Sequence, residues 1–225
     1  MTNAKAFGYL RLFTAAAIIF AVAWQIIDRL VHNVFRPGEY FAFFTILTSL
    51  FTAAVLIGAG LALMRSGEDS PGWMKLRVSL TTAYVIVAVV YNILLRNDNT
   101  VAPADALAHY QWPTPPNEIV HVWAPALVLA DFVLARFGER LKLRAAWSVL
   151  IYPLAWLVAT IIRGIATGWW PYWFLDPTGA GGVGGMLTYA GLITVFFTLV
   201  GFGLTALQRA LAGRRATSQT EALAE

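Results

Sequence analysis

The hydrophobic positions of the chain fall into six long apolar stretches separated by short polar breaks. The stretches cover roughly Ala6–Ile27, Tyr40–Leu63, Met74–Leu95, Asn117–Phe137, Ala145–Ala166 and Gly185–Leu207. Each is about as long as the ~20 apolar residues that carry an α-helix across a bilayer. The breaks between them are rich in Gly, Pro and charged residues, which is typical of connecting loops.

The pattern inside the stretches is helical. Runs such as AAAIIFAVAW and TTAYVIVAVVY are apolar at every position, whereas the strands of membrane barrels alternate. The chain therefore predicts an all-α membrane protein, in which residues 1–208 form one six-helix transmembrane bundle. Residues 209–225 predict a polar, irregular tail, and no internal repeat is visible.

Composition excludes several classes of protein. Of the 225 residues, 59% are hydrophobic and only 12% are charged, against roughly 25% charged residues in an ordinary soluble domain. A soluble globular enzyme, a disordered chain and a nucleic-acid-binding module are all excluded on this ground. The absence of cysteine from the sequence also excludes disulfides, thiol catalysis and thiolate metal sites.

The net charge of +4 acts as a topology signal. If the N-terminus lies in the cytoplasm, only Arg29, Arg36, Arg96 and Arg163 fall on the outer side, and the other twelve of the sixteen Lys and Arg residues fall inside. The positive-inside rule therefore predicts that both termini are cytoplasmic. The segment WQIIDRLVHN at the end of the first stretch offers no small-residue cleavage site, so a retained helix is expected there in place of a signal peptide.

The polar residues of the expected helices gather at one depth, just below the outer surface. They are Thr45, Thr48, Ser49, Tyr91, Asn92, Asn117, Glu118, His121 and Arg163. Thr45 and His121 are each roughly 6–8 Å below the start of their helix, at 1.5 Å per residue. The two side chains can meet if the second and fourth helices are neighbours. Because intramembrane polar groups are costly, this clustering favours a functional site.

Local spacing around the histidine adds detail. Asn117 and His121 are four residues apart and share a helix face. A partner on one ring nitrogen fixes the tautomer at the other, and Asn117 or Glu118 could supply that partner. Pro125 follows His121 by four residues, which frees the His121 carbonyl and favours a kink.

Each of these residues also has a purely structural interpretation. A threonine such as Thr45 often bonds back to its own helix, and a lone intramembrane histidine often joins two helices. Arg163 could extend its charge to the interface. Asp131 lies deeper, toward the cytoplasm, where burial favours its neutral form unless a cation is near, and it could link to the basic inner loop.

Two further patterns have simple explanations. Gly179, Gly181 and Gly184 fit the spacing of a dinucleotide-binding fingerprint, but a fingerprint needs a preceding strand, and DPT stands there instead. We therefore expect an outer loop at this point. The aromatic cluster of Trp169, Trp170, Tyr172, Trp173 and Phe174 is typical of an interfacial belt, and its second interpretation is a wall for an acyl chain.

Zinc is a rival interpretation of the histidines. All three, His32, His109 and His121, fall on the expected outer side. Intramembrane zinc hydrolases hold their metal with such residues and leave one position open for water. However, His32 and His109 lie in expected loops, without the H-x-x-x-H spacing of a helix-borne site.

Several segments carry a family resemblance. FFTILTSL, NEIVHVWAP with the later Asp131, and RGIATGWWPYWFLDP occur in this order on the second helix, on the fourth helix and after the fifth. Together they resemble the six-helix family of androgen-induced gene one and the androgen-dependent TFPI-regulating protein, including its bacterial members. The resemblance extends from about Tyr40 to Asp176.

The resemblance implies a threonine hydrolase that cleaves fatty acid esters of hydroxy fatty acids. It implies Thr45 as the nucleophile, His121 as the essential histidine, Asn117 four residues before it, and Asp131 as a supporting acidic residue. The aromatic segment of the family corresponds to Trp169–Asp176 here. It also implies a bacterial inner-membrane protein, while the depth of the polar residues predicts that the site lies toward the outer side.

Chemistry extends this assignment to further candidates. Thr45 would need His121 as an adjacent base, because a threonine hydroxyl is a weak nucleophile. Asn92 is a candidate oxyanion donor and Arg163 a candidate partner for a substrate carboxylate. We count Thr48, Trp169, Trp170 and Tyr172 as substrate-binding candidates.

Three functions remain open at this point. The first is a carboxylic ester hydrolase whose partners are a lipid or fatty-acid ester and the membrane lipids, with no cofactor and no nucleic acid. The second is a non-catalytic lipid-binding or carrier protein. The third is a zinc-dependent hydrolase.

Overall fold

The computed structural model describes residues 2–96, 110–134, 140–179 and 181–222. Its elements are α1 (Thr2–Val31), α2 (Pro37–Tyr40), α3 (Phe44–Ser66), α4 (Pro71–Val90), η1 (Tyr91–Leu95), α5 (Thr114–Glu118), η2 (Ile119–Trp123), α6 (Ala124–Leu134), η3 (Leu143–Leu150), α7 (Ile151–Thr167), η4 (Trp173–Leu175) and α8 (Gly182–Ala222). Segments η1 and η2 are π-helical and η3 and η4 are 3₁₀-helical. The described residues contain no strand.

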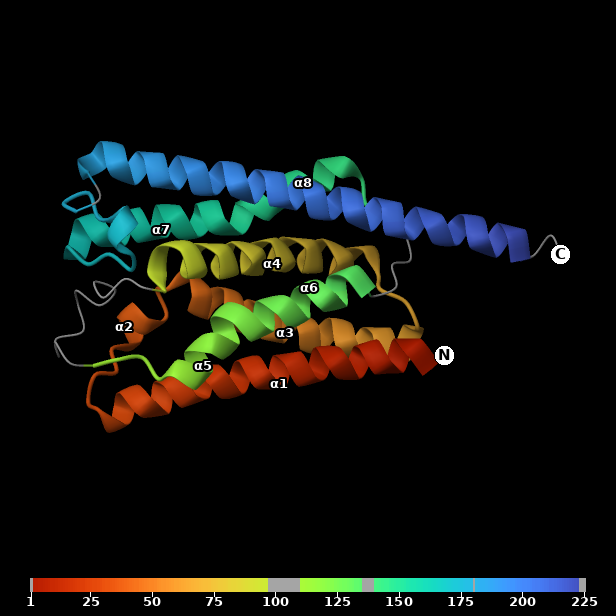
Figure 1. Cartoon of the computed structure of the whole chain (residues 1–225), viewed down its shortest axis with the longest axis horizontal. Coiled ribbons are helices and arrows are strands. Elements are labelled where there is room, and N and C mark those ends of the chain that lie inside the picture. The colour runs from red at the N-terminus through yellow and green to blue at the C-terminus, as the bar shows by residue number, and fades with distance from the viewer. Residues whose placement is uncertain (1, 97–109, 135–139, 180, 223–225) are drawn as a thin grey trace.

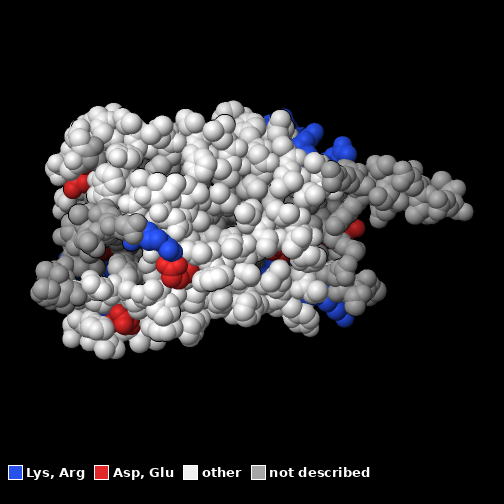
Figure 2. Space-filling view, in the orientation of Figure 1, with Lys and Arg blue, Asp and Glu red and all other residues white. Residues whose placement is uncertain are grey.

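Six spans confirm the predicted all-α membrane bundle. Helices long and apolar enough to cross a bilayer cover Ala4–Val31, Phe44–Ser66, Pro71–Leu95, Thr114–Leu134, Leu143–Thr167 and Gly182–Ala212. Figure 1 shows that α1 begins and α8 ends at the same end of the bundle, as an even number of spans requires. Lys and Arg side chains gather near that end on the face shown in Figure 2, and the rest of this face is largely uncharged.

The helix boundaries differ from the expected ones by a few residues, and three of the differences have a clear cause. The second span begins at Phe44 because α2 ends at Tyr40 and the extended Phe43 (φ −65°, ψ 131°) separates the two helices. The fourth begins earlier, at Thr114, because prolines are tolerated in a first helical turn. The segment 209–222, expected to be irregular, continues α8, since it contains many strong helix formers and no proline.

Helix α4 lies in the middle of the bundle. It packs against α3, α6, α8 and η3, while α1 packs against α3, α6 and η2, an arrangement that can be followed in Figure 1. Close approach of α1 and α3 depends on small residues, as is common between membrane helices. A Cβ atom added to Gly60 would lie 3.2 Å from the Gly8 carbonyl oxygen and 3.3 Å from Arg11 Cβ.

Four charged side chains form a buried ionic cluster where α1, α4 and α6 meet the α3–α4 connection. Arg11 donates to Asp69 at 2.6 and 2.7 Å and to Asp131 at 3.1 Å, and Arg77 donates to Asp131 at 2.6 Å and to Asp69 at 2.5 Å. All four side chains are at most 4% exposed. The cluster carries two positive and two negative charges, so the burial of each ion is offset by its neighbours.

This cluster changes the interpretation of three residues. Arg11 and Arg77 were counted as inner-surface cations, but the structure buries them inside the bundle. Asp131 accepts hydrogen bonds from the guanidinium groups of Arg11 and Arg77. Its contacts therefore fit the structural alternative, although its partners lie on α1 and α4 and not on the inner loop.

The outward surface of the spans is apolar. Phe13 and Phe20 on α1, Ile162 and Ile165 on α7 and Leu199 on α8 are all more than half exposed. In a six-span bundle such side chains face lipid, where exposure of apolar surface carries no cost. Helices α7 and α8 are the least buried of the six, which leaves space between them and the centre of the bundle.

Candidate functional site

A cavity opens among α1, the start of α3, η1, α5 and η2. We call it the polar cavity. Its lining residues are Gln25, Phe43, Thr45, Ile46, Tyr91, Leu95, Arg96, Trp112, Asn117, His121 and Tyr172. Thr45 and His121, which the sequence expects at one depth, thus line the same space, and α3 and η2 are neighbours. None of these described lining residues is a carboxylate.

Thr45 lies in the first turn of α3. Leu47 is bonded to the Phe43 carbonyl at 3.2 Å, so the N–H groups before it in the turn have no acceptor within the helix. The side chain of Thr45 is nearly buried, with 7% of the residue exposed. Because α3 begins at Phe44 and not at Tyr40, Thr45 is the second residue of its helix. Partial positive charge at a helix N-terminus therefore surrounds it.

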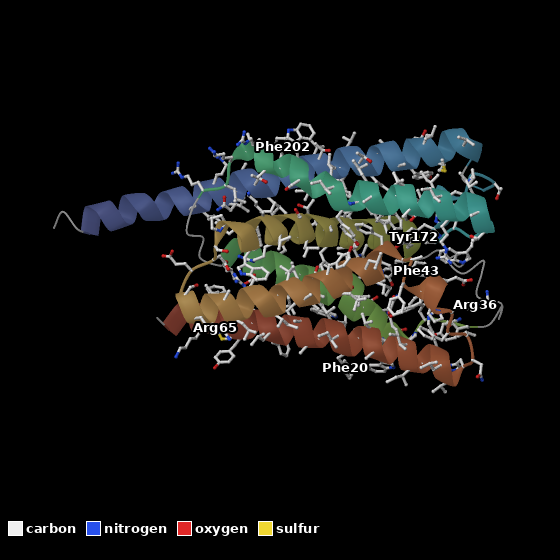
Figure 3. All side chains as sticks on the ribbon, turned by 180° about the vertical axis from the view of Figure 1, so that it is seen from behind. Phe20, Arg36, Phe43, Arg65, Tyr172 and Phe202 are labelled. Carbon is white, nitrogen blue, oxygen red and sulfur yellow. The ribbon has the colours of Figure 1, made fainter. Side chains whose placement is uncertain are left out.

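Tyr172 approaches Thr45 from the segment after α7. Burial raises the pKa of Tyr172, and interactions with the Thr45 side chain and with the Thr45 and Phe44 backbone oppose the rise. The Tyr172 hydroxyl therefore keeps its proton at neutral pH and faces the start of α3. Figure 3 labels Tyr172 and Phe43 close together, and their ring centroids are 5.7 Å apart.

The contacts of His121 fix its tautomer. Its Nδ1 lies 2.9 Å from the Asn117 carbonyl oxygen. A carbonyl only accepts hydrogen bonds, so Nδ1 carries the proton and Nε2 keeps a free lone pair in the neutral ring. The ring also stacks on Tyr91, with 3.9 Å between centroids and an interplanar angle of 16°. An imidazole held in this way can take a proton at Nε2.

The side chain of Asn117 supports this arrangement indirectly. Its Nδ2 donates to the Tyr91 hydroxyl at 2.8 Å, and the backbone of Asn117, not the side chain, holds the histidine. Tyr91 begins η1 and His121 is central in η2, so both stacked rings come from π-helical turns. Such turns are rare and occur frequently at functional sites.

An ion pair lies at the edge of the polar cavity. Arg96 donates to Glu118 at 2.5 Å, and the two side chains are 40% and 29% exposed. The Arg96 guanidinium also lies 5.4 Å from the centre of the Tyr91 ring. Because this pair is partly exposed, it can exchange partners with a charged ligand at little cost.

An apolar chamber adjoins the polar cavity at Thr45. Thr45, Leu95 and Tyr172 line both spaces. Its other walls come from α3, α4, α7, α8 and the η3 and η4 turns: Phe44, Ile86, Val87, Val90, Leu150, Pro153, Leu154, Trp156, Leu157, Phe174, Leu175, Ala190, Ile193, Thr194 and Phe197. A group bound at Thr45 can therefore direct an alkyl chain into this chamber while its polar part stays in the polar cavity.

Several expected site residues lie elsewhere. Asn92 is exposed and donates to the Ala88 carbonyl of its own helix at 2.8 Å. Arg163 is bonded to the Gly38 carbonyl and lies over Trp169 at 4.4 Å. Thr48 is fully buried and shares a hydrogen bond of 3.0 Å with Tyr152. None of the three lines the polar cavity, and Asp131 belongs to the ionic cluster.

The aromatic segment divides between two spaces. Tyr172 lines both the polar cavity and the apolar chamber. Trp169 and Trp170 instead line a separate cavity beside Asp176. Trp170 also packs directly on α7, where a Cβ atom at Gly164 would lie 2.5 Å from the indole. The aromatic cluster therefore supplies one residue to the candidate site and uses others to close the bundle.

Seven lining residues were not among the catalytic or binding candidates, and four of these seven have side chains that can form hydrogen bonds: Gln25, Tyr91, Arg96 and Trp112. Tyr91 and Arg96 had a usable signal, since they lie at the expected depth. Gln25 also had one, because a buried amide in an apolar helix is costly. Trp112 lies in a connecting segment, and nothing in its local sequence points to the cavity.

The histidines and glycines bear on the other interpretations. His32 is exposed, is bonded to the Asp28 carbonyl at 2.7 Å, and does not line the polar cavity. His109 lies outside the described residues. Within the described ranges no three His, Cys, Asp or Glu side chains gather in metal-binding geometry. Gly179 and Gly181 lie in the turn before α8 and Gly184 in its first turn.

Comparison with known proteins gives no assignment. No protein-family model matches the chain, and no curated protein or solved structure matches it.

Proposed function

We propose that this protein is an intramembrane lipid ester hydrolase with Thr45 as nucleophile and His121 as general base. One observation carries the proposal: Thr45 and an Nδ1-protonated His121 line a single cavity that adjoins an apolar chamber at Thr45. The resemblance of FFTILTSL and NEIVHVWAP to threonine hydrolases supports the same roles.

The reaction proceeds in two balanced steps. Thr45 Oγ1 attacks the ester carbonyl carbon while its proton passes to His121 Nε2, and the tetrahedral intermediate then expels the alcohol, which takes that proton. Water next attacks the acyl-threonine ester, again giving its proton to His121. The proton returns to Thr45 as the acid leaves. Tyr172 orients the Thr45 hydroxyl, and the ion pair of Arg96 and Glu118 borders the polar end of the substrate.

The proposed substrates are fatty acid esters of hydroxy fatty acids or similar acyl esters. The apolar chamber is suited to a hydrocarbon chain, and the polar cavity is suited to the ester and its polar substituents. Arg96, which lines the polar cavity, replaces Arg163 as the proposed partner for a free carboxylate. We place the protein in the bacterial inner membrane with both termini inside and the polar cavity toward the outer side, because the basic residues follow the positive-inside pattern.

The test uses the full chain in lipid nanodiscs, with a fluorophosphonate probe and a fluorogenic long-chain ester. We expect the wild type to be labelled and to turn over, and Thr45→Ala to lose both. His121→Ala should lower turnover by about 10²- to 10⁴-fold, as loss of a general base does. Two matched controls should keep activity: Thr82→Ala, a buried threonine bonded to its own helix, and His32→Ala, which bonds a carbonyl four residues back as His121 does.

The apolar chamber also favours the second candidate, a lipid carrier. Labelling and turnover that survive in Thr45→Ala would refute the threonine mechanism. If the wild type binds a long-chain lipid tightly but shows neither labelling nor turnover, the carrier function is supported. Loss of activity on chelation, restored by zinc, would support the metal hydrolase.

A further inference from the structure

Gln25 is a fully buried amide whose immediate neighbours in the chain, Trp24 and Ile26, are apolar. It lies on α1 and is 0% exposed, and its Nε2 has no hydrogen-bond partner in the described part of the chain. A buried donor without an acceptor destabilises the folded protein. A ligand in the polar cavity would satisfy this donor, because Gln25 lines that cavity together with Thr45 and His121.

Tyr40 sets the orientation of the Gln25 amide. The Tyr40 hydroxyl donates to Gln25 Oε1 at 2.9 Å, whereas its other acceptor, the Val22 carbonyl, is at 3.4 Å. Burial raises the pKa of Tyr40, so this hydroxyl stays protonated and remains a donor. Because Oε1 is engaged by Tyr40, the amide NH₂ group is the end that remains available to a ligand.

The surroundings of the polar cavity favour a ligand that accepts hydrogen bonds. Among the described residues that line it, Arg96 alone carries a formal charge, and its partner Glu118 lies at the edge of the cavity. The first turn of α3 contributes the positive end of a helix dipole at Thr45 and Ile46. Donors and positive potential thus converge on the space beside the Thr45 hydroxyl, where an ester carbonyl would lie during attack.

We infer that Gln25 Nε2 donates a hydrogen bond to the carbonyl oxygen of the ester and to the oxyanion formed from it, an inference that rests on the proposed function. When Thr45 Oγ1 bonds to the carbonyl carbon, the C=O π electrons move onto this oxygen as its negative charge. They return to re-form C=O when the alcohol leaves. Gln25 transfers no proton in either step. It takes the role that the sequence suggested for Asn92.

Substitution of Gln25 by an apolar side chain of similar length tests this role. Gln25→Met removes the donor, and turnover number should fall by about 10²- to 10³-fold with little change in KM, as for loss of one oxyanion donor. Gln25→Glu places an acceptor beside the oxyanion and should be at least as inactive. The matched control is Gln208→Met, because Gln208 is equally buried but accepts from Leu141 N at 3.0 Å far from the cavity lining.

The outcomes separate this inference from the proposed function. If wild-type turnover does not depend on Thr45, the proposed function fails and this role fails with it. If wild-type turnover depends on Thr45 but Gln25→Met keeps its turnover number within about threefold, only the role of Gln25 is overturned. If Gln25→Met does not fold, Tyr40→Phe decides: it frees the amide to rotate, so a lowered turnover number supports the role and an unchanged one overturns it.

Discussion

At the scale of single residues, the candidate site is a chain of contacts that ends at one nitrogen. Asn117 holds the Tyr91 hydroxyl with its side chain and the His121 ring with its backbone carbonyl. Tyr91 in turn stacks on the same ring. The histidine is therefore fixed by groups that do not themselves titrate near neutral pH, and only Nε2 remains to respond to a substrate.

Asn117 holds His121 through its backbone and Tyr91 through its side chain. We therefore predict a mild effect for Asn117→Ala. The backbone carbonyl survives the substitution, so the tautomer of His121 is kept, and only the hydrogen bond to Tyr91 is lost. Since such a bond contributes about 1 kcal/mol, turnover should fall about fivefold. Parallel kinetics of Asn117→Ala, Tyr91→Phe and His121→Ala would check the ranking. A loss in Asn117→Ala as large as that in His121→Ala would show that the side chain itself orients the base.

At the scale of elements, the two π-helical turns bring the rings together. A π-turn adds one residue to a helix, and this changes which side chains face inward. Residues 119–123 form such a turn immediately before Pro125, which has no N–H to offer to the His121 carbonyl. Tyr91 is placed by the equivalent turn at residues 91–95.

Removal of the extra residue should therefore abolish function without unfolding the span. Deletion of Trp123, which is 62% exposed, would convert η2 to α-helix and turn His121 by about 100° relative to α6. We expect circular dichroism to show unchanged helix content and turnover to fall to the level of His121→Ala. The substitution Trp123→Ala keeps the turn and should keep activity. Full activity in the deletion variant would contradict the role of the turn.

The sequence predicted which segments form helices better than it predicted which side chains meet between helices. The six spans follow from the length of the apolar stretches, because bilayer thickness fixes helix length. Thr45 and His121 could be linked through depth alone. Gln25 had a signal as a costly buried amide, but its contact with Tyr40 and the contacts of the arginines around Asp131 could not be predicted. These contacts depend on which helices are neighbours and how each helix is rotated. The depth of a residue in the bilayer follows from its position along the helix. The rotation of a helix about its own axis is decided by packing against its neighbours.

At the scale of the whole molecule, the candidate site and the buried ionic cluster lie in different halves of the bundle. One end carries the polar cavity, and the buried ionic cluster lies in the other half, where α1, α4 and α6 are tied to the α3–α4 connection. The cluster is complete within itself, because each carboxylate receives bonds from both arginines. It therefore supports the packing of helices against which the candidate site is built.

Disruption of the buried ionic cluster should lower the free energy of unfolding while it changes turnover little. Asp131→Asn leaves excess positive charge buried, which costs about 3–5 kcal/mol of the free energy of unfolding. Thermal unfolding in nanodiscs would measure the loss, and turnover per folded molecule should stay near that of the wild type. Glu39→Gln, which breaks an exposed pair with Arg36, should have an effect below about 1 kcal/mol. Inactive but fully stable Asp131→Asn protein would instead assign Asp131 to the reaction.

The apolar chamber has a kinetic consequence. Eight of its eighteen lining residues lie on α7 and α8, the two spans with the smallest buried share. A substrate can therefore enter sideways from the acyl-chain region and need not leave the bilayer. The relevant concentration is then the mole fraction of ester among lipids, not its amount per volume of solution. Diluting a fixed quantity of ester with inert phospholipid should slow turnover, while diluting the vesicles with buffer should not.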